Sequence, residues 1–233
     1  VVIAAVAVKE GREAWRSDTW GRNKLGGVPP KGYADRGCRL HRRGRAGDRR
    51  LEELVREAVA RVRAATGLDI VVIGAFGGYA PNWNFEAAPI HPDDPISVSW
   101  QDGDAIAELT DHTAGLGGSR VITNPNGSQR RVAGTIAASR DYYTLLTERG
   151  DHSEALAVLL HEFGHVFGLD HVDSPRELMH EDNNDLTTFG PGDLQGLRRL
   201  GQGAVLLGPR TTPFGEAAPR IVEPVLVAGL IRD

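Results

Sequence analysis

Three histidines and a glutamate lie within residues 161–171, which read HEFGHVFGLDH, at spacings that suit metal binding. On an α-helix, which turns about 100° per residue, His165 lies one turn after His161 and only about 40° around the axis. Two imidazoles on one side of a helix can bind the same metal ion. Glu162 lies about 100° from His161, so its carboxylate would stay near the ion without being a ligand.

Gly168 explains how a third histidine could join the first two. A helix continued to residue 171 would rotate His171 away from the other imidazoles. Glycine tolerates the positive φ that ends a helix sharply, so the chain can turn back and bring His171 to the ion. Three nitrogen ligands leave one position for water, which is typical of a catalytic Zn²⁺. With 8 histidines in 233 residues, a chance match to this whole pattern is improbable.

A zinc ion beside a carboxylate predicts hydrolysis. Zinc lowers the pKa of a water molecule towards about 7, and Glu162 would accept its proton and pass it to the leaving group. Two alternatives stay open: a catalytically silent zinc-binding interaction module, and a zinc hydrolase that acts on a non-protein amide. Glu162 argues against the silent module, because a structural zinc site has no use for this residue and normally fills its fourth position.

The hydrophobic pattern predicts an α+β domain around these residues. Apolar residues recur at helical spacing over 51–65 and again over 153–168, and Pro191 opens a short helix that ends near Gly201. Strands are expected at 69–76 and 95–100, and a hairpin is expected from 119–123 and 130–139 around an NPNG turn.

Three regions follow from this pattern. Residues 1–47 are expected to be an irregular N-terminal extension, 48–201 the catalytic domain, and 202–233 a tail that adds a strand or is poorly ordered. The apolar run at 1–8 fits the remainder of an export signal, with a small-residue cleavage site, or else a buried strand or an ordinary apolar terminus. We therefore expect a secreted protein, and the extension could be a propeptide, a linker or a truncated signal.

The composition of the chain argues against nucleic acid and membranes as partners. Hydrophobic residues make up 40% of the chain and charged residues 25%, as in ordinary globular proteins. The net charge of −4 gives no reason to expect nucleic acid, and no apolar run reaches the roughly 20 residues needed for stable membrane insertion. The one cysteine, Cys38, excludes an intramolecular disulfide. A monomer is favoured.

The chain resembles the metzincin metallopeptidases, and among them the matrixins, most closely the short secreted matrixin-like peptidases of bacteria. Residues 161–171 fit the HExxHxxGxxH pattern in full. Met179, the chain's one methionine, follows His171 at the spacing of the Met-turn, a loop that places a methionine beneath the three histidines. The stretch at 189–201 is similar to the C-terminal helix of a matrixin catalytic domain.

The resemblance implies a zinc endopeptidase with a metzincin fold, a mixed twisted sheet and a polypeptide substrate. It further implies that LGGSRVIT at 116–123 is the edge strand that aligns the substrate. The expected substrate-binding residues of this strand are Ser119, Arg120, Val121 and Ile122. His180, which follows Met179, is a candidate for lining the cleft or assisting the transition state, although a plain surface histidine is the simpler interpretation.

Three departures limit what the resemblance implies. Where vertebrate matrixins bind a second zinc and calcium, residues 135–143 read TIAASRDYY, which gives no support for a structural zinc and little for Ca²⁺. Cys38 lies in DRGCRLH and not in the PRCGxPD segment of matrixin zymogens, so an ordinary thiol is favoured over a zinc-blocking one. His180, Glu181 and Asp182 replace a Tyr-Pro pair near the substrate pocket, so cleavage preference is not carried over.

Overall fold

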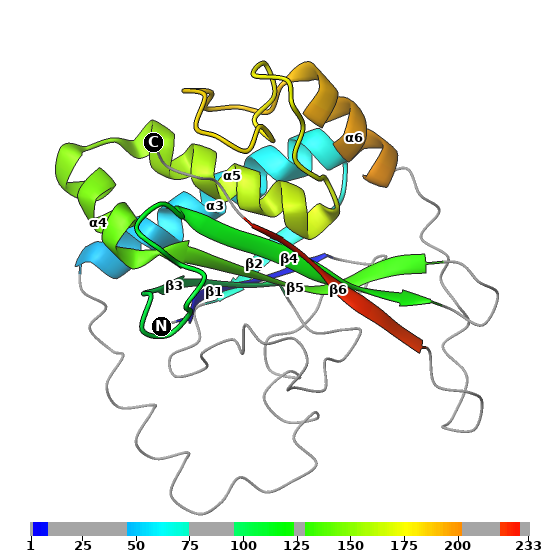
Figure 1. Ribbon diagram of the computed structural model, residues 1–233, viewed down its shortest axis with the longest axis horizontal. Coiled ribbons are helices and arrows are strands. Elements are labelled where there is room, and N and C mark those ends of the chain that lie inside the picture. The colour runs from blue at the N-terminus through cyan, green and yellow to red at the C-terminus, as the bar shows by residue number, and fades with distance from the viewer. Residues whose placement is uncertain (1, 9–45, 75–95, 124–128, 202–219, 229–233) are drawn as a thin grey trace, which may run out of the picture.

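The computed structural model describes residues 2–8, 46–74, 96–123, 129–201 and 220–228 of the chain. Over these residues one six-stranded sheet carries its helices on a single face (Figure 1). This arrangement confirms the expected α+β class. Cys38 and the NPNG turn lie outside the described residues.

The sheet has the strand order β2-β1-β3-β5-β4-β6. Neighbouring strands are antiparallel except β3 and β5, which are parallel, so the sheet is mixed as expected. The strands are β1 (Val2–Val8), β2 (Ile70–Gly74), β3 (Ile96–Gln101), β4 (Gly115–Thr123), β5 (Gln129–Ser139) and β6 (Arg220–Ala228).

The strand β1 lies between β2 and β3. A run of small and β-branched apolar residues suits such an internal strand. Residues Val2–Val8 form a strand, so the irregular structure expected over 1–47 does not extend to them. The boundaries proposed for the three regions stay a prediction.

The strand β4 is not at the edge of the sheet, contrary to expectation. Its inner side pairs with β5, and its outer side pairs antiparallel with β6 from the C-terminal region. The apolar, valine-rich sequence of β6 favours an extended strand, and the unpaired N–H and C=O groups of an edge strand are a template for such pairing. The C-terminal region thus adds a strand, which is one of the two outcomes foreseen for it.

The described residues form four helices, and three of them match the expected positions: α3 (Ala46–Thr66), α5 (His152–Phe167) and α6 (Pro191–Gly201). The helix α4 (Arg140–Arg149) was not expected. Ser139 caps its N-terminus by accepting a hydrogen bond from the backbone N–H of Tyr142, and Gly150 ends it with a φ of 71°.

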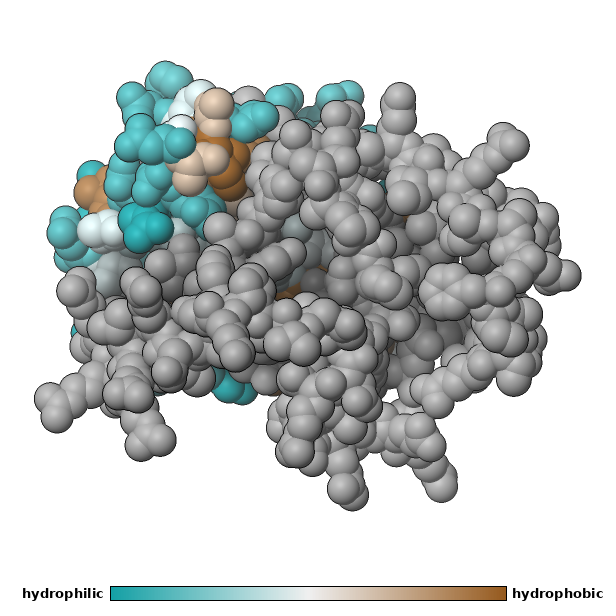
Figure 2. All heavy atoms as spheres, turned by 90° about the horizontal axis from the view of Figure 1, so that it is seen from below, coloured by the Kyte–Doolittle hydropathy of each residue, from teal (hydrophilic) through white to brown (hydrophobic). Residues whose placement is uncertain are grey.

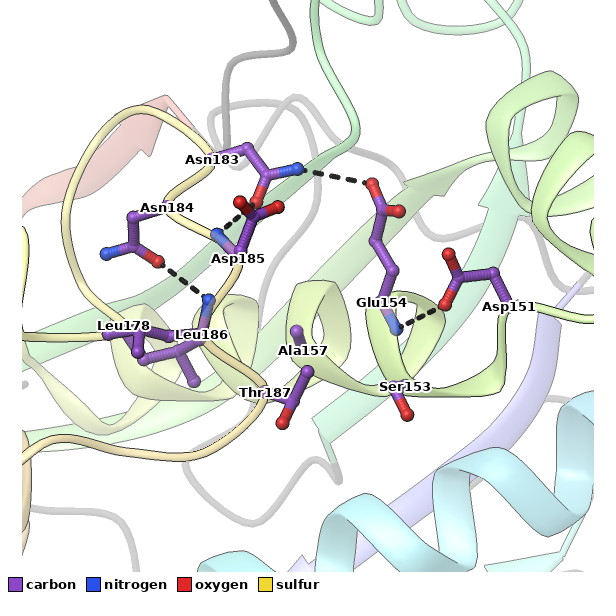
Figure 3. Close-up of a pocket in the computed structure, with 10 residues that line it drawn as sticks. All are labelled: Asp151, Ser153, Glu154, Ala157, Leu178, Asn183, Asn184, Asp185, Leu186 and Thr187. Carbon is purple, nitrogen blue, oxygen red and sulfur yellow. Dashed lines mark hydrogen bonds between the residues drawn. The ribbon is translucent and has the colours of Figure 1, made fainter.

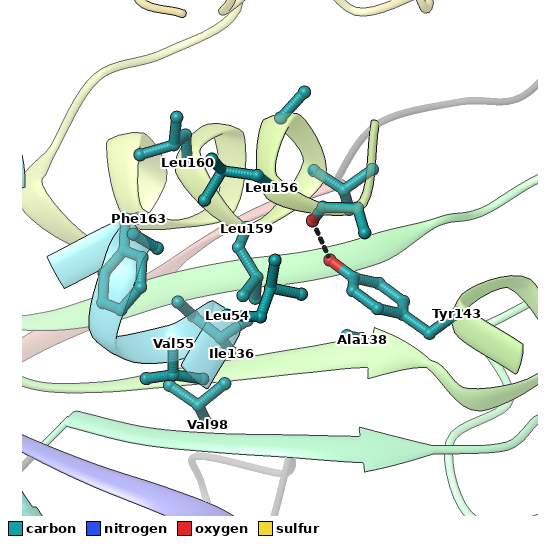
Figure 4. Packing of buried hydrophobic residues seen from close by; sticks show 14 of the residues in the cluster. Leu54, Val55, Val98, Ile136, Ala138, Tyr143, Leu156, Leu159, Leu160 and Phe163 are labelled. Atoms are coloured by element: carbon teal, nitrogen blue, oxygen red, sulfur yellow. Dashed lines mark hydrogen bonds between the residues drawn. The ribbon is translucent and has the colours of Figure 1, made fainter. Parts of the chain in front are cut away.

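The core lies between the sheet and the helices α3 and α5 (Figure 4). Every residue of α5 from Ala155 to Val166 is buried, so this helix is covered on all sides. Tyr143 of α4 joins the same core, and its hydroxyl donates a hydrogen bond of 3.0 Å to the carbonyl of Ala155. The helix α5 is therefore fixed in position along most of its length.

The surface of the described residues is mainly polar. Figure 2 shows one face, on which the described residues in view are mostly hydrophilic and hydrophobic ones form small areas. Among the described residues, Val172 is the one large hydrophobic residue that is exposed. None of the described helices is long and apolar enough to cross a membrane.

Candidate metal centre

The helix α5 positions His161 and His165 on one buried side. Asp151 begins the helix, because its carboxylate accepts a hydrogen bond of 3.2 Å from the backbone N–H of Glu154. His161 is fully buried and His165 is 2% exposed. Since the surrounding helix is also buried, both imidazoles keep a fixed orientation.

The helix ends as the glycine predicts. Gly168 adopts a φ of 104° and donates its N–H to the carbonyls of Gly164 and His165, both at 3.0 Å. Leu169 donates to the carbonyl of Gly164 at 2.9 Å, which completes a Schellman motif. The chain then returns past the helix end, and His171 reaches the other two histidines.

The three Nε2 atoms form a nearly equilateral triangle. The Nε2 of His165 lies 3.0 Å from that of His161 and 3.2 Å from that of His171, and the third side is also 3.2 Å. In a tetrahedral site with Zn–N bonds of about 2.0–2.1 Å, two nitrogen ligands lie about 3.3–3.4 Å apart. The three residues therefore fit a zinc ion, and among the described residues they form the one cluster suited to a metal.

The other ring nitrogens face backbone carbonyl groups. The Nδ1 of His161 lies 2.7 Å from the carbonyl oxygen of Leu178, and the Nδ1 of His165 lies 3.0 Å from that of Leu169. Each Nδ1 must donate its proton to that oxygen, which leaves the lone pair on Nε2 for a metal. Two of the three imidazoles thus have the tautomer of a zinc ligand.

Burial keeps these imidazoles neutral. It lowers the pKa of His161 well below the ordinary 6.5 and the pKa of His165 to about 4. Burial also lowers the pKa of His171, which is partly exposed. Because only the neutral ring can bind a metal, the site is ready for an ion at neutral pH.

Met179 lies beneath α5 at Gly164, where the resemblance placed it. Its side chain is 1% exposed. A Cβ atom added at Gly164 would collide with the sulfur of Met179, so the helix needs a glycine at this position. The methionine therefore packs against the helix between His161 and His165.

Glu162 points towards β4 and is fully buried. A Cβ atom at Gly115 would lie 2.9 Å from its Oε1, and one at Gly117 would lie 2.5 Å from its backbone oxygen. Both are too close for a real side chain, so two glycines of β4 make room for the glutamate. The contact between Glu162 and β4 was not predicted from the sequence, although a glycine within a strand often marks a close approach of another group to the backbone.

A comparison with protein families agrees with this geometry. The family model for matrixins matches residues 79–200, more than half of the chain. The chain belongs to the matrixin family. Matrixins are zinc peptidases, so the metzincin fold and the metallopeptidase class follow from this membership. Searches among curated proteins and among solved structures found no match.

The residues expected to bind substrate lie on β4, the strand whose Gly115 and Gly117 contact Glu162. Ser119 is 2% exposed, and its hydroxyl accepts a hydrogen bond of 3.1 Å from Arg131 of β5. The side chains of Arg120 and Ile122 lie outside the described residues, and Val121 is partly buried. All four belong to the segment of β4 that β6 covers, so their role in substrate binding stays a prediction.

His180 follows Met179 and is partly exposed. Its Nδ1 lies 3.2 Å from the backbone nitrogen of Asp182, and the Asp182 N–H donates to it. His180 contributes to the lowered pKa of His161 and of His171, so it lies within electrostatic reach of the metal centre. The role predicted for it in the cleft is not tested by these contacts.

A cavity of about 180 Å³ lies between the helix α5 and the loop that follows Met179 (Figure 3). The first two turns of α5 form one wall, and the loop after Met179 forms the other. Ala157, one turn before His161, lies on the helix side, and Leu178, whose carbonyl holds His161, lies on the loop side.

Proposed function

We propose that this matrixin is a zinc endopeptidase that hydrolyses peptide bonds in extended polypeptides. The observation that carries the proposal is the triangle of three Nε2 atoms at 3.0–3.2 Å with Glu162 adjacent on the same helix. The family supports a peptidase in general. The ligand roles of the three histidines and the catalytic role of Glu162 are our assignment.

Zinc, when bound, would act as a Lewis acid on the scissile carbonyl and lower the pKa of a water molecule. His161, His165 and His171 would hold the ion through Nε2. Glu162 would accept the water proton on a carboxylate oxygen and return it to the nitrogen of the leaving amine. Its burial against Gly115 and Gly117 favours these transfers, because the carboxylate is held in one place and shielded from bulk water.

The test is cleavage of casein by the zinc-loaded chain and by Glu162→Gln. The substitution keeps the shape of the side chain and removes its basicity, so cleavage should fall by about 10²- to 10⁴-fold while one zinc per chain stays bound. Glu148→Gln is the matched control, since Glu148 is exposed on α4 and should leave the rate unchanged.

Addition of a chelator should abolish cleavage in the parent and in the control. If Glu162→Gln digests casein as fast as the parent, the proposed mechanism is wrong. If zinc binds stoichiometrically and neither protein cleaves any polypeptide, the hypothesis of a catalytically silent zinc-binding module is favoured instead.

A further inference from the structure

We infer that β6 occupies the strand position that a polypeptide substrate needs, so that residues 220–228 act as an intramolecular competitor of the substrate. The inference rests on the proposed function. It concerns the C-terminal region, which the proposed reaction does not use.

The first step is the contact between β4 and the catalytic glutamate. Gly115 and Gly117 lie so close to Glu162 that neither position has room for a Cβ atom. Among the described strands, these two glycines place β4 directly against the carboxylate. An extended polypeptide that adds to the sheet beside Glu162 must therefore pair with β4.

The second step is that only one side of β4 could receive such a polypeptide. The inner side pairs with β5 over the whole strand, from Gly115 to Thr123. A polypeptide could add only to the outer side by β-augmentation, which relies on the unpaired N–H and C=O groups of the strand. In the structure β6 pairs with that side (Figure 1).

The third step is the register of this pairing. Val227 and Ala228 lie opposite Gly117 and Leu116, in the part of β4 that contacts Glu162. Neighbouring strands lie about 4.8 Å apart, so the end of β6 passes beside the catalytic centre. A substrate that paired antiparallel with β4 would follow the same path.

The pairing has an interruption that favours release. The register shifts between Ser119, which faces Val225, and Val121, which faces Val222. One residue of β4 there opposes two residues of β6, Glu223 and Pro224, as in a β-bulge. Proline has no N–H to donate, so the ladder divides into two short parts. Two short ladders open more readily than one continuous strand.

A reversible disulfide between β4 and β6 tests this inference in the full chain. Thr123 and Arg220 are Cα partners at the end of the ladder away from Glu162. Antiparallel partners lie about 4.5–5.5 Å apart, which a disulfide can span. The variant is Thr123→Cys with Arg220→Cys, in a background with Cys38→Ser so that no other thiol interferes.

The oxidised, zinc-loaded variant should cleave casein at least about tenfold more slowly than the same protein reduced with a phosphine, because the lock keeps the competitor in place. A matched control joins β1 to β2 at the opposite edge of the sheet through Ala7→Cys and Val71→Cys, which are also Cα partners. Its oxidised and reduced forms should cleave equally fast. Equal rates in the β4–β6 variant would overturn the inference.

A second readout does not need cleavage. In the Glu162→Ala background, hydrogen exchange is followed in β4 and β6 while reduced, alkylated casein is added. If casein displaces β6, the amides of 220–228 should lose protection in the reduced variant and keep it in the oxidised one.

If β6 keeps its protection in both forms, the inference is wrong. If casein displaces β6 but the parent chain never cleaves it, the inference about β4 stands and the proposed peptidase activity fails.

Discussion

Asp193 holds the backbone of Leu178 in place, and Leu178 in turn orients His161. The Oδ2 of Asp193 accepts hydrogen bonds from the N–H groups of Leu178 at 2.6 Å and of Gly190 at 2.9 Å. The carbonyl of Leu178 lies 2.7 Å from the Nδ1 of His161. One residue therefore links the start of α6, the Met-turn and a predicted metal ligand.

We expect Asp193→Ala to weaken zinc binding by roughly 10- to 100-fold, the usual effect of losing a group that supports a metal ligand. The substitution leaves buried N–H groups without an acceptor, which should also lower stability by about 1–3 kcal/mol. Competition with a zinc-binding dye measures the affinity. Asp141→Ala is the control, because Asp141 is exposed on α4. Equal affinities for the two variants would contradict the linkage.

Gly168→Ala should loosen the metal centre. The residue needs a φ of 104°, and a Cβ atom there would collide with the guanidinium of Arg131. The left-handed region costs a non-glycine residue about 1–2 kcal/mol. The control is Gly150→Ala, which introduces the same kind of strain at the end of α4. Its φ is 71°, but nothing lies within 4 Å of the added Cβ atom.

Both variants should therefore melt at lower temperature, whereas only Gly168→Ala should lose zinc affinity, because His171 follows it. A fall in zinc affinity of the same size in Gly150→Ala would show that the effect is general destabilisation.

Gly115→Ala should lower activity without removing zinc. The new Cβ atom would lie 2.9 Å from the Oε1 of Glu162, so the carboxylate must shift. Small misplacements of a catalytic group cost up to about 10²-fold in rate. Casein cleavage gives the rate and metal analysis gives the zinc content. A normal rate at full zinc content would show that the close fit of the carboxylate against Gly115 is not needed for the reaction.

The cluster of three histidines could be predicted from the sequence because its signals are local. The spacing of His161 and His165, the glycine at 168 and the methionine at 179 all act within one helix and the loop after it. The helices α5 and α6 could be predicted for the same reason, because the capping residue and the apolar residues of each helix are close together in the sequence. Within one helix, the periodicity of the sequence determines which side chains lie on the same side.

Other parts of the fold depend on contacts that no local pattern contains. The helix α4 was missed because Ser139 both ends β5 and caps the helix, with no loop between them. The reason for glycine at 115 and 117 lies in the contact of β4 with Glu162, which is far from them in the sequence. The pairing of β4 with β6 joins residues far apart in the sequence. Secretion stays a prediction.

The stability of the metal-free protein should fall as the pH drops from about 6.5 towards 4. Burial lowers the pKa of His165 in the folded chain to about 4, against the ordinary 6.5. Between these values the unfolded chain binds a proton that the folded chain does not, so the stabilising contribution is complete above pH 6.5 and is lost on acidification. For His165 the loss is on the order of 3 kcal/mol.

Urea unfolding of the chelator-treated chain at several pH values measures this loss, and His165→Gln is the comparison because it cannot take up the proton. The variant should show a shallower decline in the free energy of unfolding over this range. Parallel declines in both proteins would mean that His165 is not the group whose burial opposes protonation.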